Sequence, residues 1–236
     1  MRAPRYLLRE YAVRRLMRGW PAGYFLEVGY GGGHMLETLA RWGHRGVGYD
    51  PSPQAREAAQ QMLARQGITQ VRLVEQLPES ERFDYIFLFE VLGYFPEPEA
   101  ELRRFRGLLK PGGRIVFSFV RQDSGYSREA VGDMRTFSAA EIDGLLAAAA
   151  LKASAKWNYG FPLANLMRPA MVAVNSAWLR RQRSGAGSTG MVHTSPLMKI
   201  VGALVNRVTI WPWAAAQLLF RDTDLGNGYV VAAESA

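Results

Sequence analysis

The chain has 236 residues, no cysteine and a formal net charge of +8 at pH 7. This length suffices for one α/β domain with a sizeable core, so a second independent domain is not required. The lack of cysteine excludes disulfides, thiolate nucleophiles and cysteine-based zinc sites. The three histidines, His34, His44 and His193, are too scattered along the chain to indicate a metal cluster.

The N-terminal segment is rich in arginine, which recurs through Arg18 and interrupts any apolar core that a signal peptide would need. We therefore expect a cytoplasmic protein. The positive charge fits an acidic partner, such as nucleic acid or an anionic membrane surface, and it fits equally well a solvated cationic surface. Residues 5–19 are expected to form a helix with apolar side chains on one side and arginines on the rest.

An apolar run at residues 24–28 stops abruptly in a glycine-rich stretch at residues 29–33. The run predicts a buried strand and the glycines predict a turn. Glycine has no Cβ and tolerates positive φ, so such a turn lets backbone N–H groups approach a ligand at the start of the next helix. Residues 34–42 show helical spacing of apolar side chains. Strand, turn and helix together indicate a nucleotide-type cofactor site.

The spacing of the glycines distinguishes two cofactor classes. A dinucleotide-binding turn requires G-x-G-x-x-G, but the last position of that template falls on His34. The turn instead resembles the first motif of class I S-adenosylmethionine (SAM) dependent methyltransferases, an acid followed by G-x-G-x-G. A glycine-rich turn without a ligand is the alternative. The resemblance implies that SAM is the cofactor and that it contacts Glu27, Gly29, Tyr30, Gly31 and Gly33.

A second strand is expected at residues 46–49, followed by Asp50 and a helix at residues 54–66. A carboxylate at the carboxyl end of this strand lies beside the glycine turn, where it can accept two hydrogen bonds from a ribose diol. An aspartate before Pro51 can also cap the next helix. We expect ribose binding by Asp50, with Pro51 next to the cofactor.

A third strand at residues 71–74 leads into Glu75 and Gln76. The resemblance implies that this turn runs beside the adenine of the cofactor. The spacing is shorter than the family pattern, which has an aspartate soon after the strand. Glu75 and Gln76 are therefore either adenine-side contacts or solvated loop residues.

The fourth strand, at residues 83–89, is a nearly continuous apolar run of the kind that is buried on both faces of a parallel sheet. It resembles the fourth-strand motif of small-molecule methyltransferases. The resemblance implies that Phe89 and Glu90 border the methionine part of SAM. Many relatives carry a Glu-His pair near positions 93 and 94, and this chain has Gly93 and Tyr94 there. A base inherited from that position is therefore in doubt.

The second half of the domain continues with a helix at 99–109, a Lys-Pro-Gly-Gly turn at 110–113 and a strand to residue 119. A helix at 139–150, started by a capping box at Ser138, runs into a sixth strand at 151–158. The seventh strand is expected at 228–233. The resemblance covers residues 24–155 and implies a Rossmann-like, seven-stranded, mostly parallel sheet with helices on both faces and an antiparallel last strand.

A long connection, residues 159–227, joins the sixth and seventh strands, and we expect it to be mostly helical and to choose the substrate. The chain is expected to be a single domain, 1–236, which begins with an N-terminal helix within residues 1–20. For this helix the resemblance implies a lid or packing role, and binding to a membrane surface as a basic amphipathic helix is the alternative. The connection starts at the ligand edge of the sheet. Three interpretations stay open, namely a structural cap, a lid over a hydrophobic small molecule, and peripheral membrane contact. Neither apolar segment of this connection contains about 18 uninterrupted apolar residues, so we expect no membrane-spanning helix there.

These features favour methyl transfer from SAM to a hydrophobic small-molecule or lipid-like acceptor, with O-methylation preferred over N or C. No residue declares itself as the base, and the candidates are His193, Tyr94, Asp123 and Tyr126. No Asn-Pro-Pro-Tyr or Asp-Pro-Pro-Tyr tetrapeptide follows the fourth strand, which weakens the resemblance to relatives that methylate adenine N6 or a glutamine amide. Nucleic acid is therefore not favoured as a partner. The alternatives are a nucleic-acid methyltransferase and a SAM-binding or scaffold protein without turnover. The sequence carries no indication of oligomeric state.

Overall fold

The computed structural model describes residues 4–121, 134–166 and 208–236. Within these ranges the chain forms a seven-stranded sheet in the order β3-β2-β1-β4-β5-β7-β6. The first five strands are parallel, and β7 lies antiparallel between β5 and β6. This arrangement confirms the expected fold class. The strands are β1 (Tyr24–Val28), β2 (Arg45–Tyr49), β3 (Val71–Val74), β4 (Phe83–Phe89), β5 (Leu109–Val120), β6 (Leu151–Tyr159) and β7 (Gly228–Ser235).

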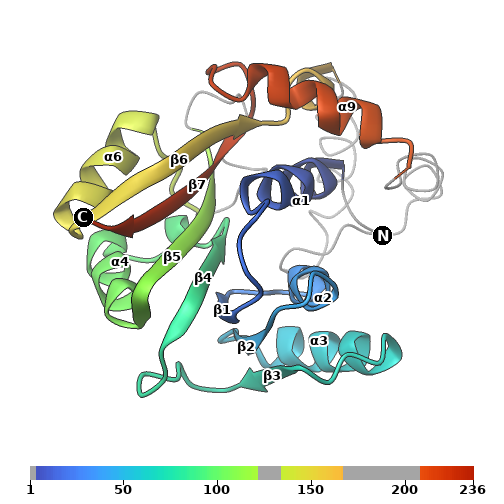
Figure 1. The fold of residues 1–236 in the computed structure, drawn as a ribbon, viewed down its shortest axis with the longest axis vertical. Coiled ribbons are helices and arrows are strands. Elements are labelled where there is room, and N and C mark those ends of the chain that lie inside the picture. Colours follow the sequence, from blue (N-terminus) through green and yellow to red (C-terminus); the bar gives the residue numbers. More distant parts are fainter. Residues whose placement is uncertain (1–3, 122–133, 167–207) are drawn as a thin grey trace, which may run out of the picture.

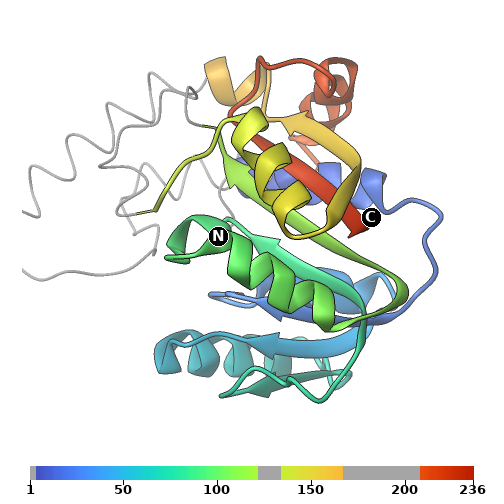
Figure 2. The same ribbon diagram turned by 90° about the vertical axis from the view of Figure 1, so that its left-hand side faces the viewer.

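Helices cover both faces of the sheet (Figure 1). One face packs against the first three helices and α9, and the other against α4 and α6, which lie in front of the strands in Figure 2. Short 3-10 helices follow β4 and α9. The helical elements are α1 (Pro4–Leu16), α2 (His34–Arg41), α3 (Pro53–Arg65), α4 (Pro98–Gly107), α6 (Ala139–Ala148), α9 (Trp211–Ala216), η1 (Leu92–Tyr94) and η2 (Gln217–Phe220).

The core of each face follows from the alternation of side chains along a strand. On β4, Tyr85 and Phe87 belong to the cluster that faces α1 and α2, whereas Ile86 and Leu88 belong to the cluster that faces α4 and α6. All four side chains are buried. The continuous apolar run in the sequence therefore reflects a strand that is covered on both sides.

One boundary differs from the sequence prediction, because β5 begins at Leu109 instead of after the Lys-Pro-Gly-Gly turn. Leu109 pairs with Phe83, and regular pairing resumes at Arg114 opposite Tyr85. The residues between them form an irregularity within the strand, where Gly112 has a φ of 74°. The glycines thus serve as a bulge inside β5, a common use of glycine in strands.

A buried amide connects the two ends of the described chain. Gln217 is inaccessible to solvent, and its side-chain nitrogen donates to the carbonyl oxygen of Leu8 in α1 at 2.9 Å. Its side-chain oxygen accepts the N–H of Gly160, just after β6, at 3.0 Å. The side-chain oxygen and the side-chain nitrogen of Gln217 therefore each have a hydrogen-bond partner. Gln217 fixes η2 and α1 to the end of the sixth strand.

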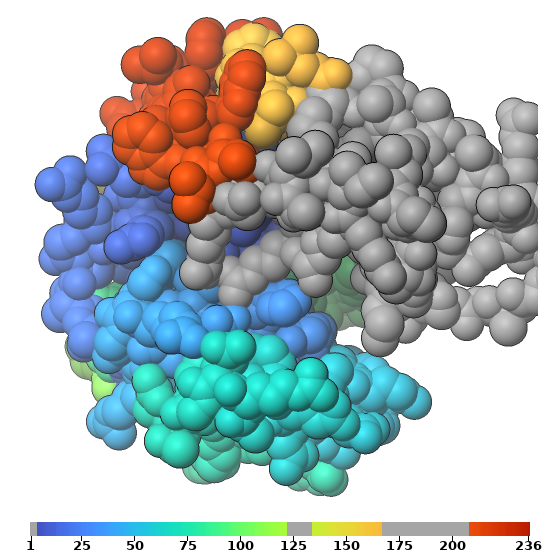
Figure 3. Space-filling model, turned by 90° about the vertical axis from the view of Figure 1, so that its right-hand side faces the viewer, coloured from blue at the N-terminus to red at the C-terminus, as the bar shows by residue number. Residues whose placement is uncertain are grey.

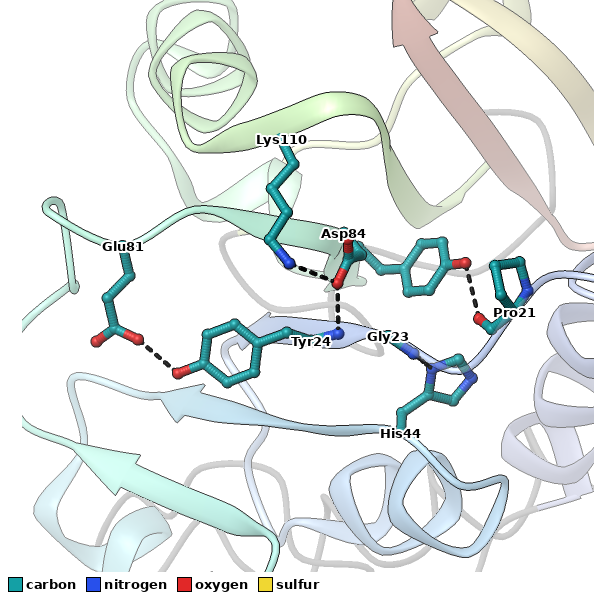
Figure 4. Close-up of polar contacts among 8 residues, drawn as sticks. Pro21, Gly23, Tyr24, His44, Glu81, Asp84 and Lys110 are labelled. Carbon is teal, nitrogen blue, oxygen red and sulfur yellow. Dashed lines mark hydrogen bonds and ion pairs between the residues drawn. The ribbon is translucent and has the colours of Figure 1, made fainter.

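The amino edge of the sheet carries a network of polar contacts (Figure 4). Asp84 Oδ2 accepts the N–H of Tyr24 at 2.7 Å and lies 2.8 Å from Lys110 Nζ. The N–H of Gly23 donates to His44 Nδ1 at 3.1 Å. Burial opposes ionisation of Asp84, but Lys110 and the Tyr24 N–H outweigh it and hold the pKa of Asp84 below its ordinary value. This network joins the starts of β1, β2, β4 and β5.

No helix among the described residues is long and apolar enough to cross a bilayer.

Replacing Asp84 tests the role of the amino edge. Asp84→Ala leaves the Tyr24 N–H and the Lys110 ammonium without their partner, so we expect a loss of about 1–3 kcal/mol in the free energy of unfolding. Chemical denaturation at pH 7 measures it. The folded pKa is depressed, so the contribution is present above the unfolded pKa and is lost as the pH falls through the folded pKa.

A matched control is Asp143→Ala, which removes an exposed ion pair with Lys156 at 2.7 Å. Exposed pairs contribute up to about 1 kcal/mol, so this variant should remain close to the wild type. Equal losses for Asp84→Ala and Asp143→Ala would contradict a special role for the amino-edge network.

Candidate functional site

The glycine turn after β1 lies at the carboxyl edge of the sheet and has left-handed backbone at three positions. The φ angles are 70° at Gly29, 52° at Gly31 and 76° at Gly33. A Cβ at Gly29 would lie 2.5 Å from Val91 Cγ2, whereas a Cβ at Gly31 would meet nothing within 4 Å. Gly29 is thus required by packing, while Gly31 leaves the backbone open to a ligand.

Asp50 holds this turn from the neighbouring strand. Its Oδ2 accepts the N–H of Gly31 at 2.9 Å, and its Oδ1 accepts the N–H of Ser52 at 2.9 Å. The helix that follows is capped by Ser52, whose hydroxyl oxygen accepts the N–H of Ala55. The side-chain cap of α3 is therefore Ser52, and Asp50 fixes the glycine turn. Each carboxylate oxygen of Asp50 has a second lone pair that can accept a hydroxyl.

Two buried side chains beside the turn carry polar atoms without a partner. Glu27 Oε2 and the Tyr30 hydroxyl make no hydrogen bond within the described part of the chain. Burial raises the pKa of Glu27 to about 8, against the opposing charge of Arg9. Burial and the charge of Asp50 raise the pKa of Tyr30 to about 12. An unsatisfied buried carboxyl costs free energy unless a ligand completes it, and a cationic group suits it best.

A cavity of about 560 Å³ lies at the carboxyl ends of β1, β2 and β3. Val28, Tyr49, Glu75 and Gln76 line it together with side chains of α4. The Glu75 side chain is largely exposed and pairs with Arg56 at 3.1 Å. Pro51 is exposed next to Asp50. The structure thus brings these predicted cofactor residues to the same edge as the glycine turn.

Glu90 lies at the end of β4 with a φ of 59°, a left-handed conformation that is uncommon for a residue with a side chain. Its Oε1 lies 2.9 Å from Arg5 Nη2 and 3.0 Å from Arg9 Nη1. The same oxygen accepts the hydroxyl of Tyr159 at 2.9 Å. Burial would raise the pKa of Glu90, but the two guanidinium groups hold it below its ordinary value. Glu90 is therefore an ionised anchor for α1.

Through this anchor α1 covers the start of the cofactor edge. The Arg9 guanidinium lies 5.1 Å from the ring centres of both Phe89 and Tyr6. Tyr6 in turn packs edge-on against His34, with ring centres 6.0 Å apart, directly after the glycine turn. The N-terminal helix therefore reaches both the end of β4 and the start of α2.

The sequence interpretation missed Arg5, Arg9 and Tyr159 as residues of this region. Arg9 is buried, although the sequence pattern placed arginines on the solvated side of the helix. Arginines four positions apart lie on one face of a helix, and that spacing was the available signal. The partner on β4 is fixed only by tertiary structure.

The proposed bases fall in two groups. Tyr94 lies on η1 with 62% of its side chain exposed. His193, Asp123 and Tyr126 lie outside the described residues. Among the described residues, no group of three or more histidine, aspartate or glutamate side chains could hold a metal ion.

Comparison with known families identifies the class of protein that this fold and site define. Residues 4–163 match the family described as "Methyltransferase domain". The chain therefore belongs to the class I SAM-dependent methyltransferases, and its cofactor is SAM. The orphaned Glu27 oxygen and the open Gly31 backbone fit a cofactor with a cationic amino-acid end.

Among curated relatives, the ubiquinone biosynthesis O-methyltransferase of Alkalilimnicola ehrlichii is 32% identical over 122 residues, 49% of each chain. The match spans about half the length of that relative. The [4+2]-cyclase SpnF has a similar structure, with a TM-score of 0.62 and 18% identity over 97% of this chain and 80% of that one.

Magnesium protoporphyrin IX methyltransferase from Synechocystis PCC 6803, solved with bound SAM, has a TM-score of 0.57 and 14% identity over 99% of this chain and 79% of that one. Identities this low establish the fold alone. Because a cyclase and a methyltransferase share the fold, the reaction must be argued from the site.

Replacing Glu27 by glutamine should separate stability from cofactor binding. The folded pKa is raised, so the stability contribution of Glu27 is present below the unfolded pKa and is lost as the pH rises through about 8. Glu27→Gln is neutral at every pH and should stabilise the unliganded protein by up to roughly 3 kcal/mol at pH 7. Thermal unfolding without SAM measures this gain.

The same variant should bind SAM at least about tenfold more weakly, because a charge-assisted hydrogen bond is lost. Calorimetry measures the affinity. At pH 4 the wild type and Glu27→Gln should unfold at similar temperatures, since Glu27 is then protonated in both states. A variant that is less stable than the wild type at pH 8 would contradict this assignment.

Proposed function

We propose that this chain transfers a methyl group from SAM to a hydroxyl of a hydrophobic small-molecule or lipid-like acceptor. The observation that carries the proposal is the unpartnered carboxyl of Glu27, buried beside an open glycine turn that Asp50 holds in place. The curated relative is named an O-methyltransferase, which supports oxygen over nitrogen or carbon as the acceptor atom.

Different residues at the carboxyl edge of the sheet would bind different parts of SAM. When bound, SAM supplies an electrophilic methyl group on a sulfonium. We assign the ammonium of the methionine end to Glu27, whose Oε2 then gains a partner. The second lone pairs of Asp50 would accept the ribose hydroxyls. Gln76 and Glu75 would border the adenine, since they line the cavity next to Val28 and Tyr49.

The remaining residues of the proposed site serve orientation and exclusion of water. Glu90 contributes indirectly, because its carboxylate is engaged by Arg5, Arg9 and Tyr159 and holds α1 against Phe89. Aligning two reactants and excluding water can supply a large part of a rate enhancement. We propose that α1 and the connection 159–227 form the lid and the acceptor pocket. A cytoplasmic location stays a prediction from the sequence.

Binding of SAM tests the premise. We expect the wild type to bind SAM in calorimetry and Asp50→Ala to bind it at least about tenfold more weakly, through loss of the turn contact and the ribose acceptors. Asp222→Ala, which changes an exposed aspartate paired with Arg221, is the matched control and should bind like the wild type. Failure of the wild type to bind SAM would remove the proposal.

The acceptor class is tested by incubating the protein with methyl-labelled SAM and separated lipid, metabolite and RNA extracts. We expect label in the lipid or metabolite fraction. Label in RNA would identify a nucleic-acid methyltransferase instead. SAM binding without label in any fraction would favour a SAM-binding protein without turnover, or a reaction of another kind on this fold.

The base is proposed among His193, Tyr94 and Tyr126. We expect His193→Ala to lower kcat by at least about a hundredfold with intact SAM affinity, because loss of a general base removes about that factor. Tyr94→Phe and Tyr126→Phe are compared in the same assay. An unchanged kcat for His193→Ala would exclude His193 as the base.

A further inference from the structure

We propose that the groove between α1, α2 and α9 is a docking surface for an anionic lipid bilayer. The groove has a volume of about 750 Å³ and lies on the face of the molecule where the blue N-terminal residues adjoin the orange residues after 208 (Figure 3). Its lining combines cationic and aromatic side chains from the three helices and the loops next to them, including Arg14, Arg15, Arg18, Arg41, Trp42 and Trp211.

Three of the arginines that line this groove have no carboxylate partner among the described residues, whereas Arg41 pairs with Glu37 at 3.0 Å and Glu10 is a further lining residue. Arg14, Arg15 and Arg18 are exposed, and the described part of the chain provides no carboxylate partner for any of them. Elsewhere on the surface arginines do find carboxylates, as Arg72 does with Glu81 at 2.6 Å. Three guanidinium groups without a described carboxylate partner, two at the end of α1 and one just after it, attract a surface of negative charge.

Trp211 lines the groove together with these arginines, and the exposed Val208 and Trp213 are its near neighbours in the sequence. Val208, Trp211 and Trp213, at the start of α9, expose 81%, 59% and 40% of their side chains. Isolated exposed apolar residues are ordinary, but a concentration of them next to cationic side chains indicates an interaction surface.

The combination of groups favours a lipid surface over another anionic partner. Guanidinium groups bind phosphates, tryptophan prefers the boundary between headgroups and acyl chains, and an aliphatic side chain such as Val208 gains free energy by entering the apolar layer. RNA would satisfy the arginines and could stack on tryptophan, but it offers no apolar layer for Val208. An anionic bilayer can bind the guanidinium groups, the tryptophan rings and the aliphatic side chain at the same time.

The position of α1 links this surface to the cofactor edge. Arg9, in the middle of the helix, is held by Glu90, and Arg14 and Arg15 at its end line the groove. One rigid helix therefore touches both regions. The docking surface does not rest on methyl transfer, because vesicle binding can be measured without SAM.

Cosedimentation with vesicles tests the charged part. We expect binding to vesicles of phosphatidylcholine mixed with phosphatidylglycerol, weaker binding at high salt, and none to phosphatidylcholine alone. The variant Arg14→Gln/Arg15→Gln/Arg18→Gln should lose at least about tenfold in affinity. The control Arg82→Gln/Arg103→Gln/Lys152→Gln removes the same charge from other parts of the surface and should bind like the wild type.

Insertion of the apolar part is tested with a single label, since the natural chain has no cysteine. An environment-sensitive fluorophore on Val208→Cys should shift to shorter wavelength when anionic vesicles are added. The same fluorophore on Ala100→Cys, an exposed position on α4, should not shift.

Three results would overturn the proposal. These are equal losses for the two triple variants, no preference for anionic vesicles, and RNA binding through the same arginines without vesicle binding. SAM affinity and the unfolding temperature, measured on each variant, show that it is folded. A failure of vesicle binding with intact SAM binding would leave the proposed function standing.

Discussion

A single carboxylate, that of Glu90, holds together three parts of the chain that are far apart in the sequence. It receives Arg5 and Arg9 from the first helix and the hydroxyl of Tyr159 from β6. Removing Glu90 would leave the buried guanidinium of Arg9 without its carboxylate, and breaking a buried ion pair in this way is destabilising in comparable cases. The position of α1 over the carboxyl edge depends on this cluster. The cofactor edge therefore gains its cover from an ion-pair cluster as well as from apolar packing.

The two edges of the sheet differ in how completely their polar groups are satisfied. At the amino edge Asp84 and His44 accept hydrogen bonds within the domain, and the network serves stability. At the carboxyl edge Glu27 and Tyr30 keep unpartnered buried atoms among the described residues. Proteins seldom leave buried polar groups unmet unless something else completes them. The unpartnered atoms of Glu27 and Tyr30 agree with the proposed placement of the cofactor at this edge.

Most of the sheet could be predicted from the sequence, because strand, glycine turn and acid are signals within a few residues of one another. Gly31 and Asp50 follow that logic, and their contact at 2.9 Å agrees with it. The role of Glu90 could not be predicted, since its partners lie as many as 85 positions away and no local pattern pairs them. The start of β5 was wrong by a few residues because a bulge and a turn share the same glycines. The connection at 159–227, which we expect to choose the substrate, lies largely outside the described ranges, so its predicted role stays a prediction.

The position of β7 has a consequence for how the protein is made. β7 leaves the ribosome after every other strand, yet it is inserted between β5 and β6. Until it arrives, β6 has no strand to pair with, and β5 presents an open edge that invites aggregation. The amide of Gln217, which joins α1 to the end of β6, is also translated late. The hydrogen bond from Gln217 to the first helix can therefore form only late in synthesis. Although α1 is made first, it is among the last elements to be fixed in place.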